Sequence, residues 1–305
     1  MLAAGAERGW RMKQAIILGT AQFGMDYGLT NRAGQVPPAI AAAILREAKK
    51  HGVSCLDTAP AYENADNVLG ALGETADFAL SMKIGAQTAS AASVDALRTE
   101  FERSLACLRR GRADILLLHR AHWLAGTPAR GVRQWLEEEK QAGRIGAYGV
   151  SVYEPADLAP VLADGPVDWV QLPLSILDPR WWRDGHLERL RTAGIRVQLR
   201  SLLLQGLVLA DPARLPPPLM PAREVLIRLD NAARRQKCSR LALALAFARA
   251  APAQALVIGV TTVAELQACL AALQTSLALD WFAFACDDAT VTDPRRWPAG
   301  IRIAA

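Results

Sequence analysis

The sequence lacks the features of a membrane protein and of a disulfide-stabilised secreted protein. No apolar run in its 305 residues approaches the roughly 18 residues that a membrane span needs. The first residues, MLAAGAERGWRMKQ, contain no hydrophobic core segment and do not resemble a signal peptide. The five cysteines form no CxxC pair, which favours reduced thiols in the core. We therefore expect a cytoplasmic protein without membrane contacts.

Signals for nucleic-acid and metal binding are also missing. The net charge is +5, but the densest basic clusters, at 109–112 and 234–237, lie at predicted helix ends and have no interleaved aromatic residues. His119 and His122 have no carboxylate nearby in sequence, so we expect no metal site. No GxGxxG loop follows the first predicted strand, which argues against a Rossmann domain. A small molecule remains as the expected partner, and the sequence leaves the oligomeric state open.

Apolar segments typical of strands alternate with amphipathic helical segments along nearly the whole chain. Eight strands are predicted, over 15–18, 53–56, 78–84, 114–118, 145–150, 169–172, 195–199 and 256–258. Eight strand–helix units within about 250 residues predict a (β/α)8 TIM barrel, an α/β fold. We expect a single domain over 15–305 after an N-terminal extension over 1–14. The residues after Leu273 show no clear period and are expected to wrap the barrel as an ordered loop.

Chemically versatile side chains occur where successive predicted strands end. Asp57, Lys83 and His119 follow this rule, and Tyr62 lies on the loop after the second strand. The carboxyl ends of barrel strands share one face, so we expect the four side chains to converge. Singly, each has a plain structural interpretation, such as a helix cap or a core histidine. Tyrosine and lysine are scarce, however, and a lysine flanked by apolar residues requires a partner, so four coincidences together favour a functional site.

An acid, a lysine, a histidine and a phenol together suit the reduction of a carbonyl group. We expect the ammonium of Lys83, held by Asp57, to lower the pKa of Tyr62 from its reference value of about 10. Tyr62 would then act as a general acid, and His119 would orient the carbonyl oxygen by a hydrogen bond. The side chains cannot supply a hydride, and a nicotinamide is the natural donor.

With these residues in place, the chain resembles the aldo-keto reductases. The matching motifs are DTAxxY with Leu-Gly twelve and thirteen residues after the Asp, a Lys after the third strand and LLH after the fourth. Further matches are GRIGAYGVS at 143–151, WVQLPLSILDPR around Gln171, RSLLLQGL at 200–207 and IGVTTVAEL at 258–266. The resemblance extends over about 15–297.

The resemblance implies a role for each matching residue. Tyr62 would be the proton donor, Asp57 and Lys83 would tune it, and His119 would orient the substrate. Ser151 and Gln171 would hold the nicotinamide carboxamide. The pyrophosphate would lie along Ser201, Leu203 and Gly206. The adenosine would lie near Gly259, Thr261 and Thr262. The full set of expected cofactor-binding residues is Gly19, Thr20, Ser151, Gln171, Arg200, Ser201, Leu203, Gly206, Gly259, Thr261 and Thr262.

Several positions depart from the family pattern. Glu63 replaces the Gly that often follows the Tyr, Val152 replaces the usual Asn, and the aromatic residue often stacked on the nicotinamide falls at Leu174. The basic residue that pairs with the 2′-phosphate in many members falls at Thr261, and the adenine-side Glu-Asn pair falls at Ala268 and Cys269. A missing cation removes a charge-assisted phosphate contact. The cofactor is therefore NADPH or NADH, with the preference open.

The expected activity is NAD(P)(H)-dependent reduction of an aldehyde or ketone, including a sugar, or the reverse alcohol or aldose dehydrogenation. A catalytically weak nucleotide-binding or regulatory barrel is the alternative, and a barrel lyase or isomerase using Lys83 as a Schiff base is a third. Gln22, Asp26 and Tyr27 either line the substrate pocket or belong to a structural turn. Trp123, Trp181 and Trp182 either stack on a substrate or pack at the rim. The Pro-rich loop 211–221 could be a lid over the cofactor or merely a rigid connection.

Overall fold

The computed structural model describes residues 14–85 and 93–303. The N-terminal extension predicted over 1–14 lies outside this range except for Gln14, whose side-chain amide donates to the carbonyl of Ala251 at 2.8 Å. Within the described residues, no helix combines the length and the apolar character needed to cross a membrane.

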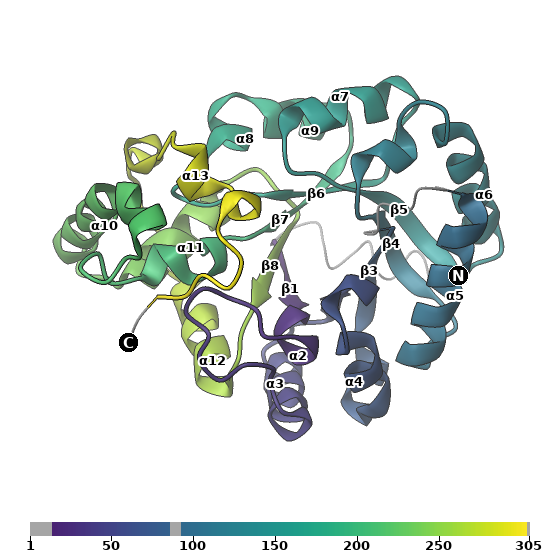
Figure 1. The fold of residues 1–305 in the computed structure, drawn as a ribbon, viewed down its shortest axis with the longest axis horizontal. Helices are drawn as coiled ribbons and strands as arrows, with labels where there is room; N and C mark the ends of the chain where they lie inside the picture. Colours follow the sequence, from purple (N-terminus) through teal and green to yellow (C-terminus); the bar gives the residue numbers. More distant parts are fainter. Residues whose placement is uncertain (1–13, 86–92, 304–305) are drawn as a thin grey trace.

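Eight parallel strands close into a barrel in sequence order, and β8 pairs with β1 (Figure 1). This confirms the (β/α)8 TIM barrel predicted from the alternating segments. The strands are β1 (Ala15–Gly19), β2 (Cys55–Thr58), β3 (Ala79–Ile84), β4 (Ala113–Leu118), β5 (Ile145–Ser151), β6 (Trp169–Pro173), β7 (Arg196–Arg200) and β8 (Ala255–Gly259).

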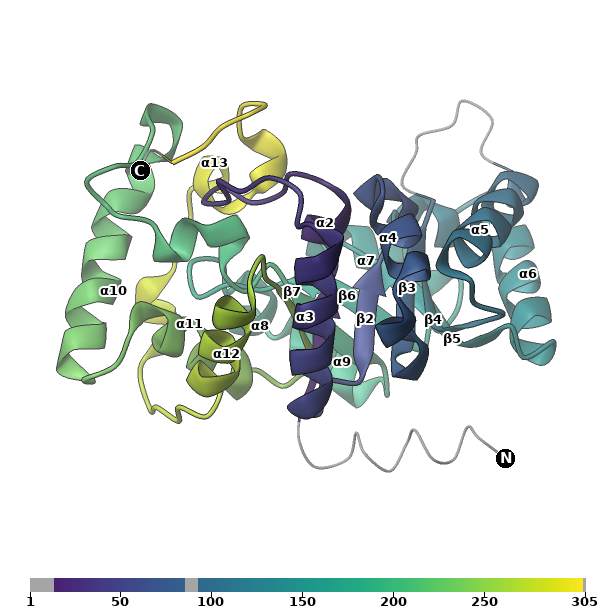
Figure 2. The ribbon, with the colours of Figure 1, turned by 90° about the horizontal axis from the view of Figure 1, so that it is seen from below.

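Helices surround the strands (Figures 1 and 2). They are α2 (Ala21–Gly24), α3 (Pro38–Lys50), α4 (Ala65–Ala71), α5 (Val94–Leu108), α6 (Ala129–Gln141), α7 (Pro155–Ala163), α8 (Arg180–Arg183), α9 (His186–Thr192), α10 (Arg223–Arg235), α11 (Arg240–Ala250), α12 (Val263–Ala272) and α13 (Ala289–Thr292). Short 3-10 helices are η1 (Pro60–Tyr62), η2 (Gly73–Asp77), η3 (Ala121–Leu124), η4 (Leu204–Leu209), η5 (Pro217–Ala222), η6 (Trp281–Phe284) and η7 (Pro294–Arg296).

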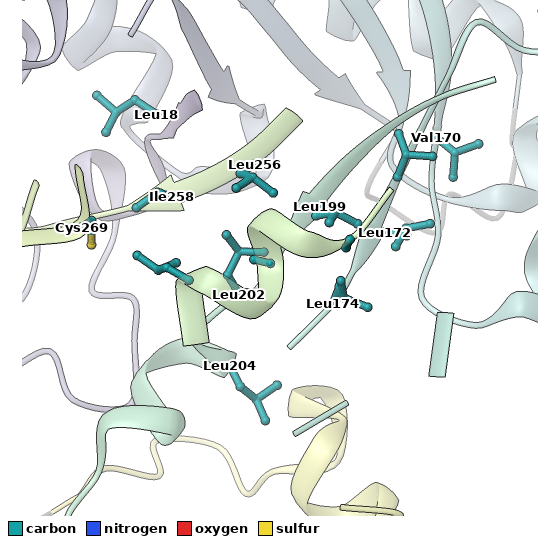
Figure 3. Close-up of a cluster of buried hydrophobic side chains, with 14 of the residues drawn as sticks. Leu18, Val170, Leu172, Leu174, Leu199, Leu202, Leu204, Leu256, Ile258 and Cys269 are labelled. Carbon is teal, nitrogen blue, oxygen red and sulfur yellow. The ribbon is translucent and has the colours of Figure 1, made fainter. Parts of the chain in front are cut away.

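The strands alternate between an outer and an inner face, as the two-residue period of a strand requires. The large cluster packed against the helices includes Leu18, Leu256 and Ile258, which Figure 3 shows with their neighbours from β6 and β7. The intervening residues Ile17 and Ala255 belong to a separate, smaller cluster. Asp57, Lys83 and Gln171 share the inner register, because hydrogen bonds join them across the barrel.

One strand boundary differs from the prediction in a way that affects the site. The sequence places a strand over 53–56 with Asp57 beyond its end, whereas β2 runs from Cys55 to Thr58 and includes Asp57. The backbone N–H and the hydroxyl of Thr20 both donate to the carbonyl of Asp57, at 3.0 and 2.9 Å. These bonds extend the pairing of β1 with β2, so the carboxylate projects from within the barrel wall.

The C-terminal tail was predicted to be an ordered loop, and this is wrong in part, because η6, α13 and η7 interrupt it. Side chains of Asp288 and Asp293 accept the N–H groups at the starts of α13 and η7, which stabilises these short turns. The tail wraps the barrel as expected. Its last described residues lie beside the loop after α2, where the N–H of Ile303 donates to the carbonyl of Leu29 at 3.2 Å (Figure 2).

Candidate active site

The four predicted catalytic residues lie together at the carboxyl end of the barrel. Asp57 and Lys83 are in β2 and β3, His119 follows β4 directly, and Tyr62 ends η1. All four line one cavity of about 550 Å³. The structure therefore confirms the predicted convergence, although whether these residues act catalytically stays a prediction.

A buried ion pair forms the floor of this site. Lys83 Nζ lies 2.6 and 2.5 Å from the two carboxylate oxygens of Asp57, and the side chains are only 1% and 4% exposed. Asp57 also accepts a hydrogen bond from Gln171 Nε2 at 2.7 Å, and Gln171 donates to Gln198 Oε1 at 2.9 Å. Burying two charges is costly unless further hydrogen bonds satisfy them. Gln171 supplies such a bond to Asp57, and Gln198 in turn holds Gln171. The sequence analysis missed Gln198, which its inward register, two residues before Arg200, could have indicated.

Tyr62 lies against this ion pair. Its hydroxyl donates to Asp57 Oδ2 at 3.5 Å, the long end of the hydrogen-bond range, and Lys83 Nζ is 5.1 Å from the centre of its ring. Burial raises the pKa of Tyr62 well above its usual value, and the Asp57 carboxylate adds to the increase, whereas Arg200 opposes it. The predicted lowering of this pKa is therefore wrong. The reason is that Asp57 compensates the charge of Lys83, so desolvation dominates.

His119 is a neutral imidazole at physiological pH. Burial and the nearby charges of Lys83, Arg200 and Arg120 lower its pKa to about 3. Its Nδ1 is buried without a hydrogen-bond partner in the described part of the chain. A neutral ring can donate one hydrogen bond without adding charge to the site.

Most predicted cofactor-binding residues line the same cavity. These are Gly19, Thr20, Arg200, Ser201, Leu203, Gly206, Gly259 and Thr261. Three others have different positions. Gln171 is fully buried and bonded to Asp57, Ser151 lines a neighbouring cavity of about 410 Å³, and Thr262 caps α12 by accepting the N–H of Glu265 at 3.1 Å. Thr262 thus starts α12 directly after Thr261, and its position near the adenosine stays a prediction.

The loop after β7 carries unusual backbone conformations where it lines the cavity. Ser201, Leu204 and Gln205 have positive φ angles of 58°, 47° and 54°. Such conformations are costly for residues other than glycine and cluster at ligand clamps. At Gly206, with φ of 98°, a Cβ atom would lie 2.3 Å from the hydroxyl of Thr30 on the loop after α2. This loop is therefore shaped for close approach at the cavity rather than for packing alone.

The cavity residues fit a nicotinamide dinucleotide. The cavity extends from the catalytic side chains to Thr261 and Cys269 beside α12, and 550 Å³ lies in the usual range for ligand pockets. His119 lines the cavity, and its buried Nδ1 has no partner among the described residues, as a polar ligand site would leave it. The strained loop after β7 and the guanidinium of Arg200 provide polar groups along the cavity wall.

The structure also decides between the alternatives for the loop after β1, the tryptophans and the Pro-rich loop. Gln22 and Tyr27 line the cavity, whereas Asp26 is exposed and pairs with Arg302 at 3.0 Å. The tryptophans pack at the rim: Trp123 and Trp181 are buried, and Trp182 lies between the rings of Phe247 and Phe282. The segment 211–221, considered as a lid, does not line the cavity.

Two further residues near the site, Tyr153 and Arg295, were not predicted. Tyr153 lies on the boundary between the two cavities, and the guanidinium carbons of Arg200 and Arg295 lie 4.1 and 4.2 Å from the centre of its ring. Arg295 belongs to the C-terminal tail, far from Tyr153 in sequence. No local pattern could have indicated this contact.

Comparison with known proteins gives the family. The model of the aldo/keto reductase family matches residues 15–283. A search of curated sequences gave no match. Among solved structures, the chain is similar to the holo form of aldo-keto reductase AKR11C1 from Bacillus halodurans, with 20% identity and a TM-score of 0.70, covering 92% of this chain and 95% of that one.

A second similar structure is the PA4992 protein from Pseudomonas aeruginosa, with 21% identity and a TM-score of 0.62, covering 85% of this chain and 88% of that one. At such identities these structures support the fold, while the family match extends over most of the chain. The chain therefore belongs to the aldo-keto reductase family, whose members are carbonyl oxidoreductases that use NADPH or NADH.

Proposed function

We propose that this protein interconverts an aldehyde or ketone and its alcohol, with Tyr62 as the general acid and base. The observation that carries the proposal is the convergence of Tyr62 and His119 on one cavity wall above the buried Asp57–Lys83 pair. The bound cofactor supplies the hydride. The protein supplies position, a proton and a polar surface for the carbonyl oxygen.

The high pKa of Tyr62 suits a proton donor of this kind. The phenol is protonated at physiological pH, and the alkoxide that forms from a carbonyl is a stronger base than a phenolate. Tyr62 Oη can therefore give up its proton to that oxygen as negative charge develops on it. Asp57 and Lys83 fix the position of Tyr62, and the N–H of neutral His119 is available to the same oxygen.

The ion pair argues against the Schiff-base alternative. Lys83 Nζ is held by both oxygens of Asp57, so it is a charged hydrogen-bond donor rather than a free amine. A lyase mechanism would also leave Tyr62 without a role. We therefore do not propose it.

Replacement of Tyr62 by Phe tests the proposal. The Tyr62→Phe variant should fold and bind nucleotide, and its kcat with any accepted aldehyde should fall by about 10²- to 10⁴-fold, the usual contribution of a general acid. Tyr148→Phe is the matched control, because Tyr148 lies on β5 in the outer cluster and does not line the cavity. Turnover is measured with a panel of aldehydes, ketones and free sugars and with both nicotinamides.

The outcomes separate the proposal from the binding-only alternative. Full activity of Tyr62→Phe would exclude Tyr62 as the proton donor. Quenching of tryptophan fluorescence by NADPH or NADH without turnover of any carbonyl compound would favour a nucleotide-binding barrel.

A further inference from the structure

The guanidinium of Arg200 is a charge without a counterion at the cavity wall. It ends β7, lines the cavity, and donates to the carbonyl of Val152 at 3.2 Å and to the hydroxyl of Ser201 at 3.3 Å. Both partners are neutral. Within residues 14–85 and 93–303, no carboxylate forms an ion pair with it.

The other two cations that contact the site's tyrosines are neutralised. Lys83, against Tyr62, is paired with Asp57. Arg295, against Tyr153, lies 2.8 Å from Asp293 and 2.9 Å from Glu154. Arg200, at 4.1 Å from the centre of the Tyr153 ring, therefore contributes the unbalanced positive charge of this group.

The position of Arg200 is fixed by its contacts. The backbone carbonyl of Val152, the hydroxyl of Ser201 and the ring of Tyr153 together hold the guanidinium. A planar guanidinium is well suited to stacking on a ring. The positive charge of Arg200 also acts on Tyr62, Lys83 and His119, because it contributes a lowering to the pKa of each, although burial raises that of Tyr62 overall.

We propose that Arg200 makes this site bind the reduced nicotinamide cofactor more tightly than the oxidised one. The inference rests on the proposed function, which requires the nicotinamide to lie beside Tyr62 and therefore near Arg200. The oxidised ring carries one positive charge, and a hydride, a proton with two electrons, neutralises it. A fixed cation nearby disfavours the charged ring, and a partly buried wall screens this repulsion less than water does.

The ratio of two dissociation constants isolates this effect. The oxidised and reduced forms share the same adenosine and pyrophosphate, so contacts to those parts cancel in the ratio. We expect the Kd of the oxidised form to exceed that of the reduced form by about tenfold or more at low salt. For a two-electron couple, a tenfold ratio corresponds to a shift of about 30 mV in the potential of the bound cofactor.

The experiment measures Kd by fluorescence titration for NADH, NAD⁺, NADPH and NADP⁺ with the full chain. Arg200→Gln should lower the oxidised-to-reduced ratio about tenfold, to near one, whereas Arg200→Lys should keep most of it. Arg196→Gln is the matched control, because Arg196 begins the same strand and stacks on Trp169 at 4.6 Å but does not line the cavity. Circular dichroism confirms that each variant is folded.

Each outcome has one meaning. If Arg200→Gln weakens both forms equally and leaves the ratio unchanged, the inference is overturned, and Arg200 serves only as a general contact to the nucleotide. If Arg200→Lys abolishes the ratio as Gln does, charge is not its cause. If no nucleotide binds to the unaltered protein, the proposed function fails instead.

Discussion

At the β2–β4 end of the cavity, the charged side chains of Asp57 and Lys83 are buried and bonded to each other. The carboxylate of Asp57 has hydrogen-bond partners on three elements, β3, η1 and β6. At the β8–α12 end, the lining residues are mostly apolar or small. The carboxylate of Glu265 there accepts bonds from the N–H and hydroxyl of Thr261 at 2.6 and 2.9 Å. No Lys or Arg occurs in the sequence between Arg249 and Arg295. We therefore propose that the first end determines the chemistry and that the second leaves the choice of nucleotide to weaker contacts.

Removing one member of the buried pair should give the largest effect. Lys83→Met leaves the Asp57 carboxylate uncompensated in a site that is 4% exposed, and should lower the free energy of unfolding by about 3–5 kcal/mol. Urea denaturation measures this. Lys140→Met is the control, because its pair with Asp168 is about one-third exposed and should cost less than about 1 kcal/mol. Equal losses in the two variants would contradict the importance of burial.

The neutral state of His119 should give a pH-dependent stability of intermediate size. Its folded pKa of about 3 lies below the unfolded value of about 6.5, so the unfolded chain binds more protons between these pH values. Stability should therefore fall as pH decreases from 6.5 toward 3, with a slope of at most about 1.4 kcal/mol per pH unit from this residue.

Urea denaturation of His119→Asn across this range tests the prediction, since its profile should be flatter than that of the unaltered protein. His122→Asn should change the profile less, because His122 is exposed, although its pKa is also lowered by burial and by Arg120. An unchanged profile in His119→Asn would show that His119 is not the residue responsible.

A cation added at the β8–α12 end should have the smallest effect. Ala268 lines this end of the cavity and is exposed, so Ala268→Arg can place a guanidinium there without disturbing the core. We expect it to raise the affinity for NADPH relative to NADH by about tenfold through a charge-assisted contact to the 2′-phosphate. Titration with both nucleotides measures the change, and Ala268→Gln controls for size. An unchanged preference would place the 2′-phosphate elsewhere.

The sequence was sufficient to predict the barrel and the gathering of the proposed catalytic residues. Eight strands with helices between them leave few alternative folds. Closure of the barrel then brings Asp57, Lys83 and His119 to one face. Predictions of individual contacts were less reliable wherever a residue's partner lies far along the chain. The contact of Tyr153 with Arg295, for example, joins the loop after β5 to the C-terminal tail, and no local motif indicates it.

The sequence by itself determined the order of the strands, the gathering of the site residues at one end of the barrel and the pairing of scarce ionisable groups, because these follow from local periodicity and from the cost of burying an unpaired charge. Only the tertiary structure decided the sign of the Tyr62 pKa shift, the bonds of Gln171 to Asp57 and Gln198, and the stacking of Arg200 on Tyr153. These depend on how deeply each group is buried and on which distant charges balance. Both are set by three-dimensional distance, which sequence spacing does not give.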